Sequence, residues 1–145
     1  MRAARDRFGT LNTLCFLGEA AETSGDHARA LRLYRDSMRI NREFVDSRDR
    51  LVQYLEGAGR LAEARGDFAR ALLLLVAARR ERERIRVPGT PLEQETARDF
   101  LARICERVPE SAFTRASEVA RVRPFDDIVA DELAIAREDD APVNG

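Results

Sequence analysis

The sequence predicts an all-α protein made of two helical hairpins followed by a C-terminal cap of three helices. Residues 14–33 return 41 positions later as residues 55–74, with 11 of the 20 residues identical. Within each copy, apolar residues recur three and four positions apart, which is the period of an amphipathic helix. Three further apolar segments follow, each opened by a proline. An internal repeat fixes the architecture of a chain, so it carries the most weight here.

Each copy of the repeat predicts two helices joined by a tight turn. Gly25-Asp26 and Gly66-Asp67 provide the turn, because glycine accepts the left-handed conformation that ends a helix and aspartate caps the next one. Asp6 is predicted to cap the first helix, and Ser47, 41 positions later, the third. The four helices are expected at about 6–23, 27–44, 48–64 and 68–86, with a link at 45–47.

The segment after the repeats predicts a helical cap. Thr90 is followed by Pro91 in the first turn and by Glu93 three positions on, which is the pattern of a capping box. This helix is expected to end near Val108, and the next two are expected at about 110–122 and from Pro124 onward. The predicted division is therefore 1–87 for the hairpins, 88–137 for the cap and 138–145 for a polar, disordered tail.

The repeat resembles the tetratricopeptide repeat. The match rests on a small residue in the first helix, an alanine early in the second and a large residue four positions later: Gly18, Ala30 and Tyr34, then Gly59, Ala71 and Leu75. The closing proline of the family is absent, since Arg42 and Glu83 hold its place. The period of 41 also exceeds the usual 34 or so, as in the longer-helix variant of MalT-like regulators. The resemblance implies a tetratricopeptide-like α-solenoid that binds other proteins.

From residue 55 to residue 133 the chain also resembles the C-terminal end of LuxR-type and related bacterial signalling ATPases. The corresponding pieces are the last repeat helix, a proline-containing link, a phenylalanine-centred helix and a short acidic helix: 75–84, 88–93, 113–121 and 125–129. Ser117 and Ala120 stand where the family often has tryptophan and glycine. This resemblance implies a fragment or remnant of a signalling or transcriptional regulator, without its nucleotide-binding and helix-turn-helix domains.

Composition limits the classes of partner. The chain has 145 residues, of which 35% are charged, yet its formal net charge is only −1. This balance favours neither nucleic acid nor an anionic membrane as a partner. No apolar run of about 18 residues and no secretory signal occurs, so we expect a soluble, cytoplasmic protein without a membrane partner. Cys15 and Cys105 stand alone on separate predicted helices, and no disulfide is expected.

The sequence holds no recognisable catalytic, metal or cofactor site. His27 is the only histidine, and it replaces Phe68 of the second copy, so packing or surface exposure is the simpler interpretation. One histidine and two distant cysteines do not match zinc-ligand spacing. Neither GxxxxGK[ST] nor GxGxxG occurs. We therefore expect no enzyme and no cofactor; an enzyme completed only on oligomerisation is a third alternative.

The tetratricopeptide resemblance places a partner site on the concave face, which the first helix of each hairpin lines. Carried over to this chain, the lining residues are Asn12, Cys15, Glu19, Glu22, Gln53, Glu56, Arg60 and Glu63. Four glutamates against one arginine predict an acidic groove for a basic peptide or helix. The alternative is a solvated face with pairs such as Glu56 and Arg60 one turn apart.

Two further surfaces are predicted. The stretch from Arg79 to Arg86 is arginine-rich, and it predicts either a nucleic-acid contact or a solvated helix end whose cations suit the helix dipole. At the N-terminal edge the first helix carries more apolar residues than one partner helix covers. We therefore expect self-association through the first hairpin, with Phe8, Leu11 and Phe16 at the contact.

Overall fold

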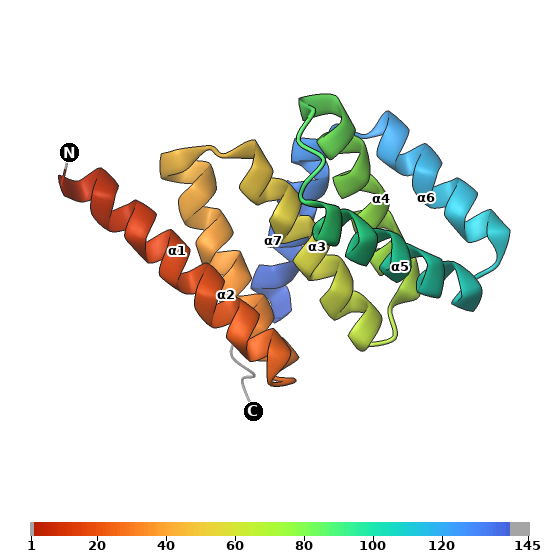
Figure 1. Cartoon of the computed structure of the whole chain (residues 1–145), viewed down its shortest axis with the longest axis horizontal. Coiled ribbons are helices and arrows are strands. Elements are labelled where there is room, and N and C mark those ends of the chain that lie inside the picture. Colours follow the sequence, from red (N-terminus) through yellow and green to blue (C-terminus); the bar gives the residue numbers. More distant parts are fainter. Residues whose placement is uncertain (1, 140–145) are drawn as a thin grey trace.

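The computed structural model describes residues 2–139, with side chains from residue 6 to residue 135. Within this part of the chain the protein is entirely helical, which confirms the predicted all-α class (Figure 1). The elements are α1 (Arg2–Thr23), α2 (His27–Ile40), the π-helical turn η1 (Asn41–Val45), α3 (Arg48–Ala64), α4 (Phe68–Ile85), α5 (Pro91–Arg107), α6 (Glu110–Val122) and α7 (Phe125–Asp139).

The two copies of the repeat form two antiparallel hairpins with the same turn. Gly25 and Gly66 have φ angles of +87° and +83°, and so use the left-handed conformation that glycine was predicted to supply. Asp26 and Asp67 then cap α2 and α4, each accepting a hydrogen bond from the backbone N–H three residues later, at 3.2 and 3.3 Å. The local signals in the sequence therefore determine both turns.

Two predicted boundaries are wrong. Helix α1 begins at Arg2, so Asp6 lies inside it and does not act as a cap; the stretch before it is rich in alanine and arginine, which are good helix formers. Helix α2 ends at Ile40, and the chain continues through the wider turn η1 to Asp46, whose φ is 55°. The buried Asn41 side chain holds this link by exchanging hydrogen bonds with the backbone of Ser47, at 3.0 and 3.1 Å.

The glycines inside the helices mark close packing of side chains. A Cβ on Gly18 would lie 2.6 Å from the ring of Tyr34, and a Cβ on Gly57 would lie 3.1 Å from the other edge of that ring. Tyr34 of α2 is thus wedged between α1 and α3. The corresponding contact of the second hairpin pairs Gly59 with Leu75, at 3.0 Å. The repeat therefore persists in the packing as well as in the sequence.

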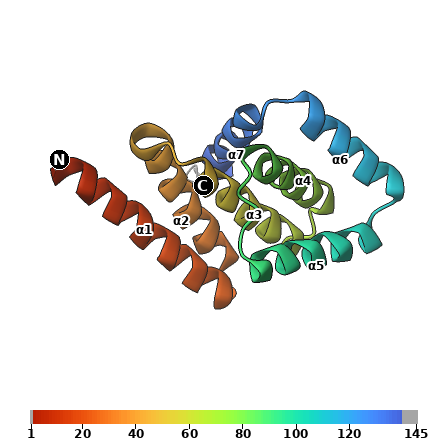
Figure 2. The same ribbon diagram turned by 45° about the horizontal axis from the view of Figure 1, so that its top comes forward.

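The three cap helices surround α4. Helices α5, α6 and α7 all contact α4, and α7 also reaches α2. Figure 2 shows α5 and α6 diverging from their connection, so that they cover different sides of α4. Ile128, Val129 and Leu133 of α7 are buried in the core. Helix α7 continues to Asp139, two residues into the predicted tail; residues 140–145 lie outside the described part of the chain.

Candidate functional site

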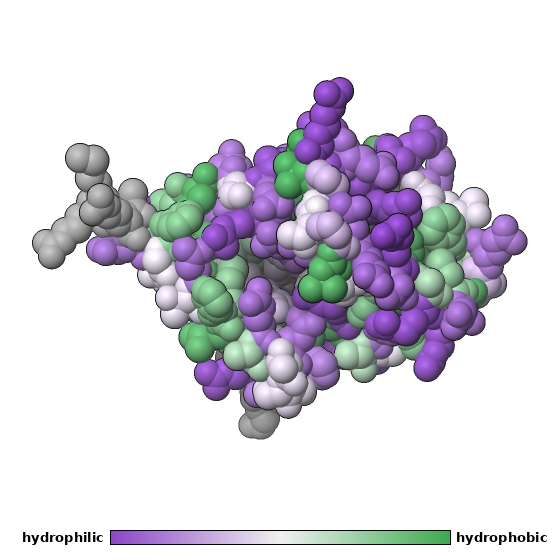
Figure 3. Space-filling model, in the orientation of Figure 1, coloured by the Kyte–Doolittle hydropathy of each residue, from purple (hydrophilic) through white to green (hydrophobic). Residues whose placement is uncertain are grey.

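A groove runs across the face formed by α1, α3 and α5. One recess between α1 and α3 has a volume of about 400 Å³, and two further recesses of about 210 and 600 Å³ lie against α5. Glu56 and Glu93 line all three recesses, so the recesses form one continuous surface. Figure 3 shows mostly hydrophilic side chains on this side of the molecule. The first helix of each hairpin thus lines a groove, as expected for a partner site.

Arg50 organises the end of the groove between α1 and α3. Its guanidinium donates one hydrogen bond to Oδ1 of Asn12 and contacts Sγ of Cys15 at 3.7 Å. The same sulfur lies 2.9 Å from Oγ of Ser37 on α2. The Phe8 ring lies beneath the guanidinium, 5.5 Å from ring centre to Cζ. All these partners are neutral, so among the described residues no carboxylate neutralises Arg50.

A second cluster bridges the hairpins at Glu22. Its carboxylate accepts hydrogen bonds from Arg60 at 2.7 and 3.1 Å and from the Tyr34 hydroxyl at 2.8 Å. Burial by itself would raise the pKa of Glu22, but the bonds from Arg60 and Tyr34 outweigh it and hold the pKa below its ordinary value. Burial and the bond to this carboxylate together raise the pKa of Tyr34. Glu22 therefore stays ionised and fixes the spacing of α1 and α3.

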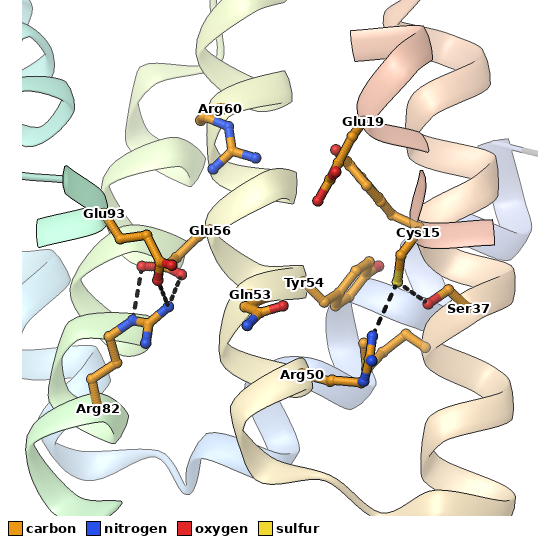
Figure 4. A pocket seen from close by; sticks show the side chains of 12 residues that line it. Cys15, Glu19, Ser37, Arg50, Gln53, Tyr54, Glu56, Arg60, Arg82 and Glu93 are labelled. Atoms are coloured by element: carbon orange, nitrogen blue, oxygen red, sulfur yellow. Dashed lines mark hydrogen bonds and ion pairs between the residues drawn. The ribbon is translucent and has the colours of Figure 1, made fainter. Parts of the chain in front are cut away.

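A third cluster joins α3, α4 and α5 through Arg82. The Arg82 side chain is almost fully buried, and it donates two hydrogen bonds to Glu56, at 2.6 and 3.1 Å, and one to the Val87 carbonyl, at 3.1 Å. Asp49 and Glu93 lie 3.6 and 3.8 Å from the guanidinium. Figure 4 shows Arg82, Glu56 and Glu93 converging at one side of the recess. This cluster sets where α5 stands against the hairpins.

The structure brings most of the predicted lining residues together. Cys15, Glu19, Gln53, Glu56 and Arg60 line the recess between α1 and α3. Asn12 and Glu22 bind two of the arginines that line it, as described above. Glu63 does not line it; its carboxylate lies 3.8 Å from Arg103 on α5.

The recess between α1 and α3 is balanced in charge, and this corrects the acidic surface predicted there. Arg50, Arg82 and Glu93 also line the recess, which gives three arginines against three glutamates. The comparison of the two copies does not reveal Arg50 and Arg82, because the positions 41 residues earlier hold Gly9 and Asn41. Glu56 forms its ion pair with Arg82, whereas the helical spacing predicts Arg60 as its partner.

Two charged groups in the recess stay without an oppositely charged partner in the described part of the chain. One is Arg50, whose acceptors are neutral, and the other is Glu19, which is exposed on α1 and whose carboxylate makes no hydrogen bond or ion pair there. Figure 4 shows the Glu19 carboxylate extending from α1 into the space between the helices. A bound segment can therefore meet one free anion and one free cation without breaking an existing pair.

The arginine-rich stretch from Arg79 to Arg86 does not form one cationic surface. Arg82 is buried in the groove cluster, and Arg84 binds Glu81 at 2.5 Å. Arg79 lies 3.6 Å from Glu83. Among the described residues, Arg80 and Arg86 alone of these arginines form no ion pair. These contacts match a solvated helix end more closely than a stripe that binds phosphates.

The residues predicted for self-association have three different environments. Leu11 is 0% exposed, so its assignment to the contact surface is wrong; it lies on the side of α1 that faces the hairpin. Phe8 is 46% exposed and lies against Arg50 on the groove side. Phe16 is 73% exposed and lines none of the groove recesses. Phe16 alone therefore remains a candidate anchor at the edge.

Other candidate chemistry is sparse. Cys15 is half-buried and Cys105 is exposed, and both are free thiols. His27 is partly buried beside Glu22, and its Nδ1 has no hydrogen-bond partner. Over the described residues, no three histidine, cysteine or carboxylate side chains gather as metal ligands, and no helix is long and apolar enough to cross a membrane. Comparison with family models, curated proteins and solved structures gives no match.

Proposed function

We propose that the protein is a non-catalytic interaction scaffold that holds an extended or helical segment of a partner protein in the groove across α1, α3 and α5. The observation that carries this proposal is the pair of free charges, Glu19 and Arg50, in a recess whose other charged groups are internally paired. Paired groups keep the walls in place, so little ordering cost is left for the binding step. The free pair supplies the recognition.

The groove fits a segment of mixed charge. A lysine or arginine of the segment would approach Glu19, and a carboxylate or backbone carbonyl would accept from Arg50. Tyr34, Met38 and Tyr54 line the recess between these groups and provide apolar contact. Charge-assisted hydrogen bonds in a half-enclosed recess contribute more than exposed ion pairs do. We therefore propose a partner with both charges close together, in place of the purely basic peptide that the sequence favours.

The wider context of the scaffold rests on the two resemblances. A tetratricopeptide-like repeat and a cap similar to that of bacterial signalling ATPases support a fragment or remnant of a cytoplasmic signalling or transcriptional regulator. The groove contains a thiol and a serine hydroxyl, but no histidine or carboxylate binds either one as a general base in the described residues. This supports a binding role over a catalytic one.

A selection from a random peptide library on the purified protein tests the proposal. Peptides enriched on the wild type should lose at least tenfold in affinity for Glu19→Arg and for Arg50→Glu, each measured by fluorescence anisotropy. Glu106→Arg and Arg115→Glu provide matched controls, since both residues are exposed on the cap away from the groove. Equal binding to all four variants, or a selection that enriches no sequence, would refute the groove as the site.

The alternative of a nucleic-acid-associated regulator is separated by salt. Each phosphate that a protein neutralises on duplex DNA adds about −0.9 to the slope of log K against log salt. With Arg80 and Arg86 as the unpaired arginines of the stretch, we expect no slope steeper than about −2. A slope of about −5 or steeper that becomes less steep in the Arg80→Ala variant would support nucleic acid as the partner.

A further inference from the structure

The repeat shows which face of α1 is built to be covered. Five exposed α1 residues between positions 10 and 20 line none of the groove recesses, and they form its outer face: Thr10, Thr13, Phe16, Leu17 and Ala20. Shifted by 41 positions, they become Leu51, Tyr54, Gly57, Ala58 and Leu61, all of which are buried. Helix α2 packs against α3. The outer face of α1 is therefore the same repeat surface without its neighbouring hairpin.

One contact illustrates the equivalence. Gly57 of α3 lies against the Tyr34 ring of the preceding hairpin, with a Cβ distance of only 3.1 Å. Its counterpart on α1 is Phe16, which is 73% exposed. Glycine at this place makes room for a neighbour already present in the chain. Phenylalanine at the same place instead projects a large apolar side chain from α1, which lies at the end of the helix stack and packs mainly against α2 (Figure 1).

The outer face is also unusual in its lack of charge. In a chain with 35% charged residues, none of these five is charged, and the exposed Asp6 stands only at the N-terminal end of the same face, one turn before Thr10. Gly9 lies one turn away on α1, and a Cβ there would meet nothing within 4 Å. An exposed helical glycine costs about 1 kcal/mol against alanine. Neither solvation nor packing within the chain accounts for this composition.

We propose that the outer face of α1 binds the same face of a second copy of this chain, related by a two-fold axis. Two identical faces can meet antiparallel in this way without opposing like charges, because their residues between positions 10 and 20 carry no charge and the two Asp6 side chains would lie at opposite ends. Between these positions a charged partner would find no complementary group on the face. Head-to-tail stacking is blocked, because α5 and α6 pack on α4, the helix that would have to take the place of α2. Closed pairing of two α1 helices is the arrangement that remains.

Sedimentation equilibrium of the full chain between 1 and 100 µM tests this proposal. The wild type should form a dimer, and Phe16→Glu should weaken dimerisation at least tenfold by placing two carboxylates across the axis. At a concentration where both proteins are monomeric, the melting temperature of Phe16→Glu should stay close to that of the wild type, since the side chain is exposed. Val122→Glu is the matched control: Val122 is 64% exposed on α6, far from this face, and its variant should dimerise like the wild type.

Two results would overturn the proposal. One is a wild-type monomer over the whole concentration range. The other is a dimer that both Phe16→Glu and Ala20→Glu leave intact, because Ala20 lies on the same face and fills no space in the core. Ala20 lines none of the groove recesses, so peptides selected on the groove should bind Ala20→Glu unchanged. Failure of the dimer and failure of the groove are therefore distinguishable.

Discussion

Replacing Gly18 with alanine is the sharpest test of how the two hairpins are joined. The added Cβ would lie 2.6 and 2.7 Å from Cε1 and Cδ1 of Tyr34, distances that side chains in proteins do not adopt. The ring cannot retreat freely, because Gly57 of α3 lies at its other edge, where even an added Cβ would stand only 3.1 Å away, and the Tyr34 hydroxyl is bonded to Glu22. The substitution must therefore push α1 away from α2 or move the ring toward α3.

Two opposing effects set the size of the change. Alanine in place of glycine inside a helix gains about 1 kcal/mol. Overpacking of a well-filled contact costs about 1–3 kcal/mol, and a ring fixed on two sides places this case in the upper half of that range. The net loss should be about 1–2 kcal/mol. At roughly 4 °C per kcal/mol for a chain of this length, the melting temperature should fall by about 4–8 °C.

Urea denaturation of a double-mutant cycle with Tyr34→Leu checks the cause. Leucine stands at the matching place of the second hairpin, Leu75, where the flexible side chain can yield to a Cβ. In the Tyr34→Leu background, the loss caused by Gly18→Ala should shrink by at least about 1 kcal/mol. Gly9→Ala on the same helix is the control, and it should raise the free energy of unfolding by about 1 kcal/mol both with Tyr34 and in the Tyr34→Leu background. All these variants also carry Phe16→Glu, which excludes dimerisation. A coupling energy below about 0.5 kcal/mol would refute the wedge.

Three further predictions concern ionisable groups. Burial raises the pKa of Tyr54 to about 12 and that of Tyr34 further, and these are the only tyrosines in a chain without tryptophan. Absorbance at 295 nm should therefore stay flat to about pH 11 in the folded protein. The free energy of unfolding should fall as pH rises above 10, because the tyrosines of the unfolded chain ionise there. The pKa of Glu22 is lowered, so its contribution is present above about pH 4.3 and lost as pH falls through the folded value; Glu22→Gln should flatten the acid limb of a denaturation series. Arg82→Met leaves the partly buried Glu56 without the guanidinium that binds it, so we expect a loss of roughly 1–3 kcal/mol and faster hydrogen exchange in α5; an unchanged exchange rate would contradict the link to α5.

Much of the fold follows from the sequence by itself. The Gly-Asp turns, the cap at Thr90 and the prolines that open α5, α6 and α7 are local signals, and each acts within one turn of backbone. The repeat adds the pairing of helices, since two amphipathic helices joined by a tight turn bury their apolar faces against each other. The turn η1 escaped prediction because Asn41 is held by Ser47 across the link, and nothing in the local sequence marks that contact.

The candidate site was decided mainly by tertiary structure. The tetratricopeptide resemblance implied that Glu19, Glu56 and Arg60 line one groove, and the structure brings them to one recess. The sequence could not show that Arg82 of the next helix reaches Glu56, because a long side chain finds its partner through the relative placement of helices. The charge of the groove, the wedge of Tyr34 and the burial of Leu11 depend on that placement in the same way. Local hydrogen bonds fix where helices begin and end, whereas long-range packing fixes which side chains meet.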